Sequence, residues 1–169
     1  MASQAIQAHR DNAEVYHGNS PCIKNIEQLL DELSLPKGLF PLDDIKEFGY
    51  DRSSGFMWLT HKKKKDHVFK KIKQTVSYEM EVTAFVENWR MKKMSGVKTK
   101  ELLLWLTITD VYIENPSSGK VTFKTGTGLS ESFPTSAFEL RVEAFELWKW
   151  WRFIYIWIGG WFCLSLMSL

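Results

Sequence analysis

The chain has 169 residues, of which 44% are hydrophobic and 14% aromatic, so it can bury the core of one folded domain and is not disordered throughout. Its net charge of +2 at pH 7 hides an uneven distribution, because seven lysines and one aspartate lie between His61 and Lys73. The two cysteines, Cys22 and Cys163, lie at opposite ends of the chain and indicate neither a disulfide framework nor a metal site.

The first 19 residues form a polar segment that we expect to be a helical extension. They carry charges and lack the apolar stretch of a secretory signal peptide. We therefore expect a cytoplasmic protein that is not secreted.

Residues 20–33 have the spacing of an amphipathic helix. Ser20 is placed to cap the first turn, and Pro21 stands where a helix does not need its N–H. Apolar residues then recur three and four positions apart, at Ile23, Ile26, Leu30 and Leu33. The prolines at positions 36 and 41 disfavour helical geometry before them and predict the end of this helix.

Between Lys46 and Phe133 apolar and polar residues alternate, which is typical of half-buried β-strands. The segment DRSSG, residues 51–55, predicts a hairpin turn between two of them. Residues 101–114 differ because they are apolar on both faces, so a helix, a second layer or a ligand must cover each face. Several antiparallel strands after N-terminal helices predict an α+β fold built on an antiparallel β-barrel or a strongly curved sheet.

The chain ends in an apolar segment, residues 140–169, which has no charged residue from Phe153 onward. SAFE, residues 136–139, is a capping box that predicts a helix continuing into this segment. Its start contains the residue types that settle at a membrane surface, Trp148, Trp150, Trp151 and Arg152. Three interpretations remain open: a membrane anchor, a segment packed on the domain, or an artefact of the gene model.

Several stretches, among them LPKGLFP and GVKTKELLLWLTI, resemble a plant family named Domain of Unknown Function 538. The resemblance covers residues 29–139, so we expect a family domain over 20–139 flanked by the extensions 1–19 and 140–169. It implies the branch of the family without a signal peptide. It also implies an antiparallel barrel similar to one half of the bactericidal permeability-increasing protein, a lipid binder. The activities it implies are binding of amphiphiles or hydrolysis of chlorophyll, in responses to stress.

The lysine run has two interpretations. It could attract an anionic lipid surface, since each lysine near such a surface contributes about 1 kcal/mol. It could equally be a solvated edge strand whose charges prevent pairing with other chains. A specific nucleic-acid partner is not indicated, because no aromatic RNA-binding motif accompanies the charge. The lysines are Lys62, Lys63, Lys64, Lys65, Lys70, Lys71 and Lys73.

Catalytic motifs are absent from the sequence. It contains no GxSxG nucleophile elbow, no HExxH pair and no phosphate-binding loop, and it indicates no cofactor and no metal. A chlorophyll hydrolase is therefore implied by the resemblance alone.

We predict a noncatalytic module that binds a lipid-like or pigment-like amphiphile on an apolar inner surface. A hydrolase and a scaffold that binds other proteins remain alternatives, and the same apolar residues would equally fill a closed core. The predicted lining consists of Val76, Tyr78, Met80, Val82, Leu102, Leu104, Leu106 and Ile108.

Overall fold

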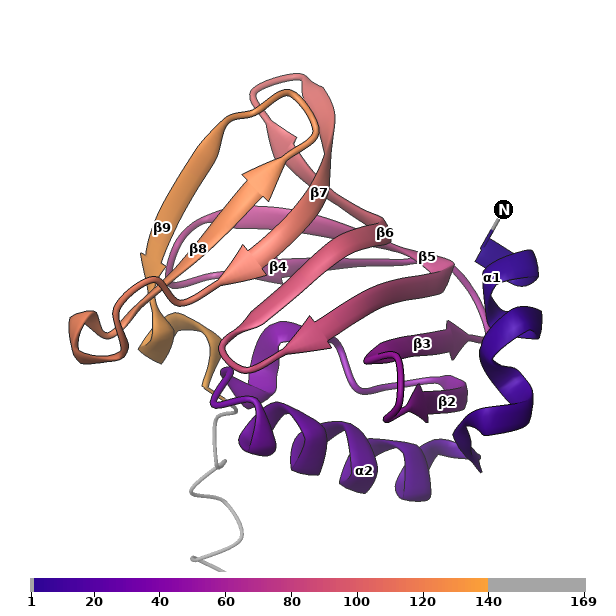
Figure 1. Cartoon of the computed structure of the whole chain (residues 1–169). Coiled ribbons are helices and arrows are strands. Elements are labelled where there is room, and N and C mark those ends of the chain that lie inside the picture. The colour runs from indigo at the N-terminus through magenta and orange to yellow at the C-terminus, as the bar shows by residue number, and fades with distance from the viewer. Residues whose placement is uncertain (1, 140–169) are drawn as a thin grey trace, which may run out of the picture. The chain divides into compact units, whose positions relative to one another are not determined.

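The computed structural model describes residues 2–139, which fold around one antiparallel sheet (Figure 1). The helical elements of this part of the chain are α1 (Ala2–His9), α2 (Asn19–Glu32) and the short 3-10 turns η1 (Arg10–Asn12), η2 (Lys37–Leu39), η3 (Pro116–Ser118) and η4 (Thr135–Phe138). The strands are β1 (Glu14–His17), β2 (Ile45–Asp51), β3 (Phe56–His61), β4 (Lys65–Phe69), β5 (Gln74–Glu87), β6 (Arg90–Glu101), β7 (Leu104–Tyr112), β8 (Lys120–Thr125) and β9 (Ser130–Pro134).

The first nineteen residues take part in the sheet through β1, which pairs antiparallel with β2. The helix α1 precedes this strand, and its Ile6 lies in one buried cluster with Phe56 and Trp58 of β3. A strand of four residues is too short for its alternation to stand out in a sequence, so the pattern predicts only the helical part of this segment.

The helix α2 is the amphipathic helix that the sequence predicts. It begins at Asn19, before the predicted cap Ser20, and its N-cap is Gly18. The side-chain oxygen of Asn19 accepts a hydrogen bond of 3.1 Å from the backbone N–H of Ile45, which ties the start of the helix to β2. Its buried residues are Cys22, Ile26, Leu29 and Leu30.

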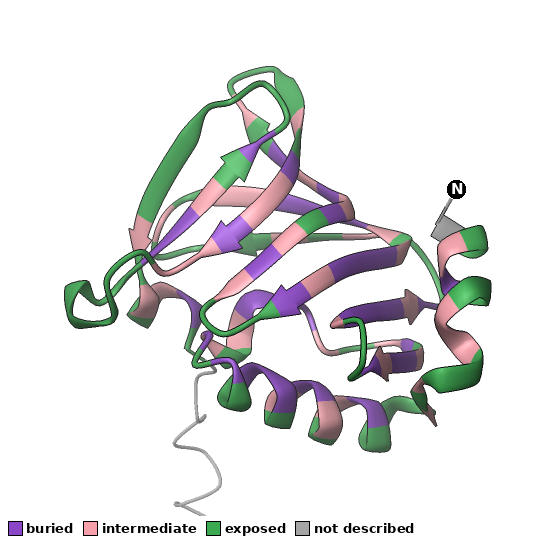
Figure 2. Cartoon of the chain, viewed as in Figure 1, coloured by how far each residue is buried: buried purple, intermediate pink, exposed green. Residues whose placement is uncertain are grey.

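The strand β3 is buried on both faces because the two helices cover opposite sides of it (Figures 1 and 2). Met57 and Leu59 belong to the large core cluster that contains the apolar face of α2. Phe56 and Trp58 point to the other face, where α1 lies, since alternate residues of a strand point to opposite sides. This end of the molecule is a filled core.

The strands pair in the order β1-β2-β3-β5-β6-β7-β8-β9, and β4 pairs with the first residues of β5. Register shifts interrupt the β5–β6, β6–β7 and β7–β8 pairs, and such bulges increase the local twist and bend the sheet. Gly96 lies in the irregular part of β6 with φ of +79°, and a Cβ there would lie 2.2 Å from the carbonyl oxygen of Glu81. This close approach of two backbones requires glycine.

The sheet does not close into a barrel, which corrects the predicted fold class, an antiparallel barrel or strongly curved sheet resembling half of a bactericidal permeability-increasing protein. Within residues 2–139, no backbone pairing joins β9 to β1 or to β4. Side chains join the β4–β5 hairpin to β9 and to the turn η4 after it instead: the ring centroids of Phe69 in β4 and Phe138 in η4 lie 4.9 Å apart, and Gln74 donates a hydrogen bond to Glu131 of β9. Paired strands lie about 4.8 Å apart, so phenyl rings that stand between the two edges prevent pairing.

The apolar C-terminal helix that formed part of the predicted fold class lies outside the described residues. Only the start of its capping box is described, and there Thr135–Phe138 form the 3-10 turn η4 without a side-chain cap.

Gly49 of β2 lies under the indole ring of Trp58, its partner in β3. A Cβ at position 49 would lie 2.1 Å from a ring carbon of Trp58, which is fully buried and has no room to move. We expect Gly49→Ala to lower the free energy of unfolding by about 1–3 kcal/mol, the usual cost of overpacking. Denaturation by urea measures this change.

Gly126→Ala is the matched control, because a Cβ there would meet Thr109 at an ordinary contact distance of 3.7 Å. If the two variants had the same unfolding free energy, the packing of Trp58 on Gly49 would be contradicted.

Candidate ligand-binding cavity

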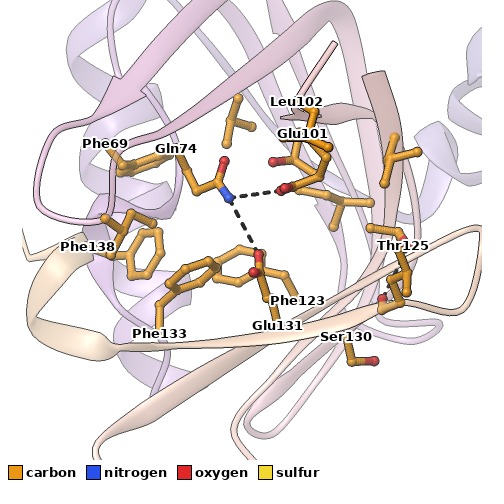
Figure 3. A pocket seen from close by; sticks show the side chains of 16 residues that line it. Phe69, Gln74, Glu101, Leu102, Phe123, Thr125, Ser130, Glu131, Phe133 and Phe138 are labelled. Atoms are coloured by element: carbon orange, nitrogen blue, oxygen red, sulfur yellow. Dashed lines mark hydrogen bonds between the residues drawn. The ribbon is translucent and has the colours of Figure 1, made fainter. Parts of the chain in front are cut away.

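An apolar cavity of about 430 Å³ lies beside the unpaired edge of the sheet (Figure 3). The β4–β5, β6–β7 and β8–β9 hairpins surround it, together with η4. Its volume falls within the range of about 300–1,000 Å³ that is usual for small-molecule sites. The apolar lining residues are Phe69, Ile72, Val76, Leu102, Leu106, Ile108, Phe123, Leu129, Phe133 and Phe138.

Aromatic rings form one wall of this cavity. Phe138 lies at the centre, and its ring centroid is 4.9 Å from that of Phe69, 5.2 Å from that of Phe123 and 6.4 Å from that of Phe133. These distances are typical of favourable aromatic pairs. The four rings come from β4, β8, β9 and η4, so the wall joins segments that are far apart in the sequence.

Three of the six polar lining residues meet in one group (Figure 3), and the other three are Thr99, Thr125 and Ser130. The amide nitrogen of Gln74 donates a hydrogen bond of 2.9 Å to Glu101 and a weaker one of 3.5 Å to Glu131. The remaining carboxylate oxygens are acceptors. The arrangement therefore suits a ligand that has an apolar body and a hydrogen-bond donor or a positive charge at one end.

Below the cavity the interior is filled. The adjoining space, which Tyr78 and Met91 help to line, has a volume of only about 20 Å³. The hydroxyl of Tyr78 donates a hydrogen bond of 2.7 Å to the carbonyl oxygen of Leu39, and burial raises the pKa of this phenol far above its usual value. A ligand therefore has room beside the open edge of the sheet and none in the core.

The structure brings together half of the predicted lining residues, and Val76, Leu102, Leu106 and Ile108 all face the cavity. Tyr78 and Val82 are buried in the core cluster instead. Met80 and Leu104 are exposed, by 56% and 67% respectively. A register shift in β5 after Tyr78 explains Met80, since it breaks the strict alternation on which the prediction depended.

A turn explains Leu104. Residues 101–114 do not form one strand, because Leu102 and Leu103 make the two-residue loop of the β6–β7 hairpin, in which Glu101 pairs with Leu104. Turns of this length favour pairs such as Asn-Gly, so two leucines gave no signal of a turn. The run that looked apolar on both faces is thus a strand end, a loop and a new strand.

The sequence analysis also missed the polar residues of the cavity, among them the hydrogen-bonded group Gln74, Glu101 and Glu131. A search for apolar faces passes over polar side chains at strand ends. Only the approach of β9 to the start of β5, which are 57 residues apart in the chain, brings these groups together.

The seven lysines of the predicted anionic-surface patch lie in and around β4, which pairs only with β5 among the described strands. Lys65 pairs with Asp43, Lys64 with Glu79 at 3.2 Å, and Lys63 with Asp44 at 4.0 Å. Lys71 donates to the carbonyl oxygen of Ser136. Their attraction to an anionic surface stays a prediction, as does that of the tail residues at positions 148, 150, 151 and 152, which lie outside the described residues.

A serine, a histidine and an aspartate meet at the β2–β3 turn, away from the cavity. Asp51 accepts hydrogen bonds of 2.6 Å from the hydroxyls of Ser53 and Ser54, and it lies 2.9 Å from Nδ1 of His9. Ser54 approaches the same ring nitrogen, at 3.1 Å. A catalytic triad requires the serine and the aspartate on different nitrogens, so this cluster anchors α1 to the turn and does not activate a nucleophile.

Other chemistry is sparse in the described part of the chain. His61 is buried and lines none of the cavities described here, and its burial lowers its pKa. Among residues 2–139, no group of three or more His, Cys, Asp or Glu side chains is arranged to hold a metal ion. No helix in the same range has both the length and the apolar character needed to cross a membrane.

The fold and the cavity define an open antiparallel-sheet protein with a largely apolar cavity beside its unpaired edge. The chain belongs to the family described as "Protein of unknown function, DUF538", whose family model matches residues 26–139. This confirms the resemblance seen in the sequence. Comparison with curated proteins and with solved structures gives no match.

The Asp51 cluster predicts a dependence of stability on pH. Hydrogen bonds, first of all that from Ser53, hold the pKa of Asp51 well below its usual value. An aspartate in an unfolded chain has a pKa of about 4. The ionised carboxylate of Asp51 therefore stabilises the fold above about pH 4, and this contribution is lost as the pH falls further. We expect Asp51→Asn to lower the melting temperature near neutral pH, and the difference from the unchanged chain to shrink in acid.

Thermal melting followed by circular dichroism from neutral to strongly acidic pH measures this. Asp66→Asn is the control, because Asp66 is exposed on β4. A deficit of Asp51→Asn that stayed constant across the pH range would contradict the role of the ionised carboxylate.

Proposed function

We propose that the chain is a noncatalytic binding module for a lipid-like or pigment-like amphiphile, and that the cavity beside the open edge of the sheet is its binding site. The single observation that supports this most is the composition of the cavity: ten of its sixteen lining residues are apolar, and three of the polar ones meet in one group. Small-molecule sites commonly combine an apolar wall with a few polar groups that orient the ligand.

The apolar part of the ligand would contact the phenyl wall and the aliphatic residues of β5 and β7. Each Å² of apolar surface removed from water contributes about 25 cal/mol. The cavity volume of about 430 Å³ suits one alkyl or isoprenoid chain, or one compact ring system. A whole chlorophyll molecule, with its tetrapyrrole and phytyl chain, is larger than this space.

The polar end of the ligand would lie against Gln74, Glu101 and Glu131. Two carboxylates repel an anionic head group and attract an ammonium or a hydroxyl. Gln74 holds both carboxylates by hydrogen bonds, so they are already oriented when the ligand arrives.

Two alternatives have weaker support. A chlorophyll hydrolase needs a nucleophile and a base beside the substrate, and the His9–Asp51–Ser54 cluster has the wrong geometry and does not line the cavity. A protein-interaction scaffold has no specific observation in its favour. A cytoplasmic location, a C-terminal membrane anchor and a role in stress are further proposals that depend on the sequence and the family.

We expect Leu106→Trp to fill the cavity and weaken the binding of an apolar probe by about tenfold, equal to about 1.4 kcal/mol. The probe is N-phenyl-1-naphthylamine, an uncharged fluorophore whose emission rises in apolar surroundings. Fluorescence titration of the full chain measures its affinity.

Leu104→Trp is the matched control, because Leu104 lies two residues away on β7 and is exposed. The control should bind the probe as the unchanged chain does. Equal affinities of the two tryptophan variants, or no binding by the unchanged chain, would contradict the cavity as a binding site.

The head-group preference gives a second prediction. Dodecylamine should displace the probe at a concentration about tenfold lower than dodecanoate, because the carboxylates attract one charge and repel the other. Replacing both Glu101 and Glu131 by Gln should reduce this ratio toward one. Glu114→Gln, at an exposed position outside the cavity, should leave it unchanged. A preference for dodecanoate would contradict the proposed role of the carboxylates.

A further inference from the structure

Leucine side chains are exposed at two neighbouring turns. Leu102 and Leu103, the loop of the β6–β7 hairpin, are 95% and 90% exposed. Leu104 follows at 67%, and Leu129 in the β8–β9 turn is 63% exposed. The two turns lie side by side at the top of Figure 1, and we call these four leucines the leucine tip.

The fold itself does not explain the leucine tip. Leu102 has φ of +54°, a conformation that costs a residue with a side chain about 1 kcal/mol and that glycine adopts freely. Two-residue hairpin loops favour polar or glycine residues for this reason. Apolar side chains that are exposed, contiguous and held in a strained loop mark a surface that contacts something else.

The residues just behind the tip indicate what that surface contacts. Lys100 pairs with Trp105 across the β6–β7 hairpin, and its ammonium lies 5.9 Å from the centre of the indole ring. Lys124 lies one residue before the end of β8, just as Lys100 lies one residue before the end of β6. The order from the tip inward is therefore leucine, then tryptophan and lysine.

That order matches the layers of a lipid bilayer. Apolar side chains enter the acyl boundary, tryptophan prefers the interface, and lysine meets anionic head groups. The charges of Glu101 and Glu131 balance those of Lys100 and Lys124, so the leucines and Trp105, and not a net positive charge, attract the tip to a bilayer. A pair of narrow hairpin turns also offers less area than a stable protein interface requires.

We propose that the leucine tip docks on a lipid bilayer, with its leucines in the acyl boundary and Trp105, Lys100 and Lys124 at the interface. Leu102 and Leu129 belong both to the tip and to the cavity lining, so docking would place the cavity beside the acyl chains. Docking goes beyond the proposed ligand binding and does not depend on it, since Leu103 and Leu104 lie outside the cavity.

A fluorophore on the tip tests the proposal in the full chain. Leu103→Cys is labelled with a nitrobenzoxadiazole, in a chain that also carries Cys163→Ser. The remaining Cys22 is fully buried, and burial raises the pKa of its thiol, so the reagent spares it. The control label is at Met80→Cys, because Met80 is an exposed apolar residue outside the tip.

The probe surface is a vesicle of phosphatidylcholine with a minority of phosphatidylserine. We expect the label at position 103 to shift its emission to shorter wavelength on addition of vesicles and to be quenched by nitroxide-labelled lipid, while the label at position 80 does neither. The label reports only its own surroundings, so membrane binding through any other part of the chain does not produce this result. Three outcomes would overturn the proposal: no response at position 103, an equal response at both positions, or a shift that appears without vesicles as the protein concentration rises.

A pair of serine substitutions separates docking from ligand binding. The double substitution Leu103→Ser with Leu104→Ser removes two of the leucines that would enter the bilayer. We expect it to slow the transfer of N-phenyl-1-naphthylamine from vesicles to the protein by about tenfold. Binding of the same probe from water should remain unchanged. Loss of both would mean a damaged fold, and unchanged transfer would count against docking, whereas failure of the unchanged chain to bind the probe would contradict only the cavity proposal.

Discussion

The aromatic contact of Phe138 with Phe69, Phe123 and Phe133 is the constraint on which the rest of the site depends. These rings come from β4, β8, β9 and η4 and meet beside the unpaired edge, where no backbone pairing joins β9 to the β4–β5 hairpin. At this edge, side chains meet in place of a hydrogen-bond ladder, and space remains beside the wall of phenyl rings. The cavity, its opening and its polar group all follow from that unpaired edge.

The two ends of the sheet are therefore built differently. Around β2 and β3, the helices α1 and α2 cover both faces and large side chains such as Trp58 fill the interior. Around β7, β8 and β9, neither α-helix of the described chain covers the inner face, and the bulges bend the strands round an incompletely filled space. The filled core lies at the first end, and the cavity and the exposed leucines lie at the second.

The candidate site was predictable where strand alternation is regular. Val76, Leu106 and Ile108 were found because each points inward from a paired strand. Alternation failed at Met80, which follows a bulge, and at Leu104, which follows a turn made of leucines. It had no means of finding Gln74, Glu101 and Glu131, since polar residues at strand ends look alike whether they face solvent or a cavity.

The sequence by itself determined the local structure and the family. The apolar periodicity of α2, the alternation of β5 and the motifs LPKGLFP and GVKTKELLLWLTI are properties of neighbouring residues, and they need no distant partner. Only the tertiary structure decided that the sheet stays open and where the cavity lies. Those features depend on contacts such as Phe69 with Phe138 and Gln74 with Glu131, which join residues more than fifty positions apart. No local pattern encodes whether two edges meet through backbone groups or through side chains, because that outcome depends on how the bulges of several strands add up in space.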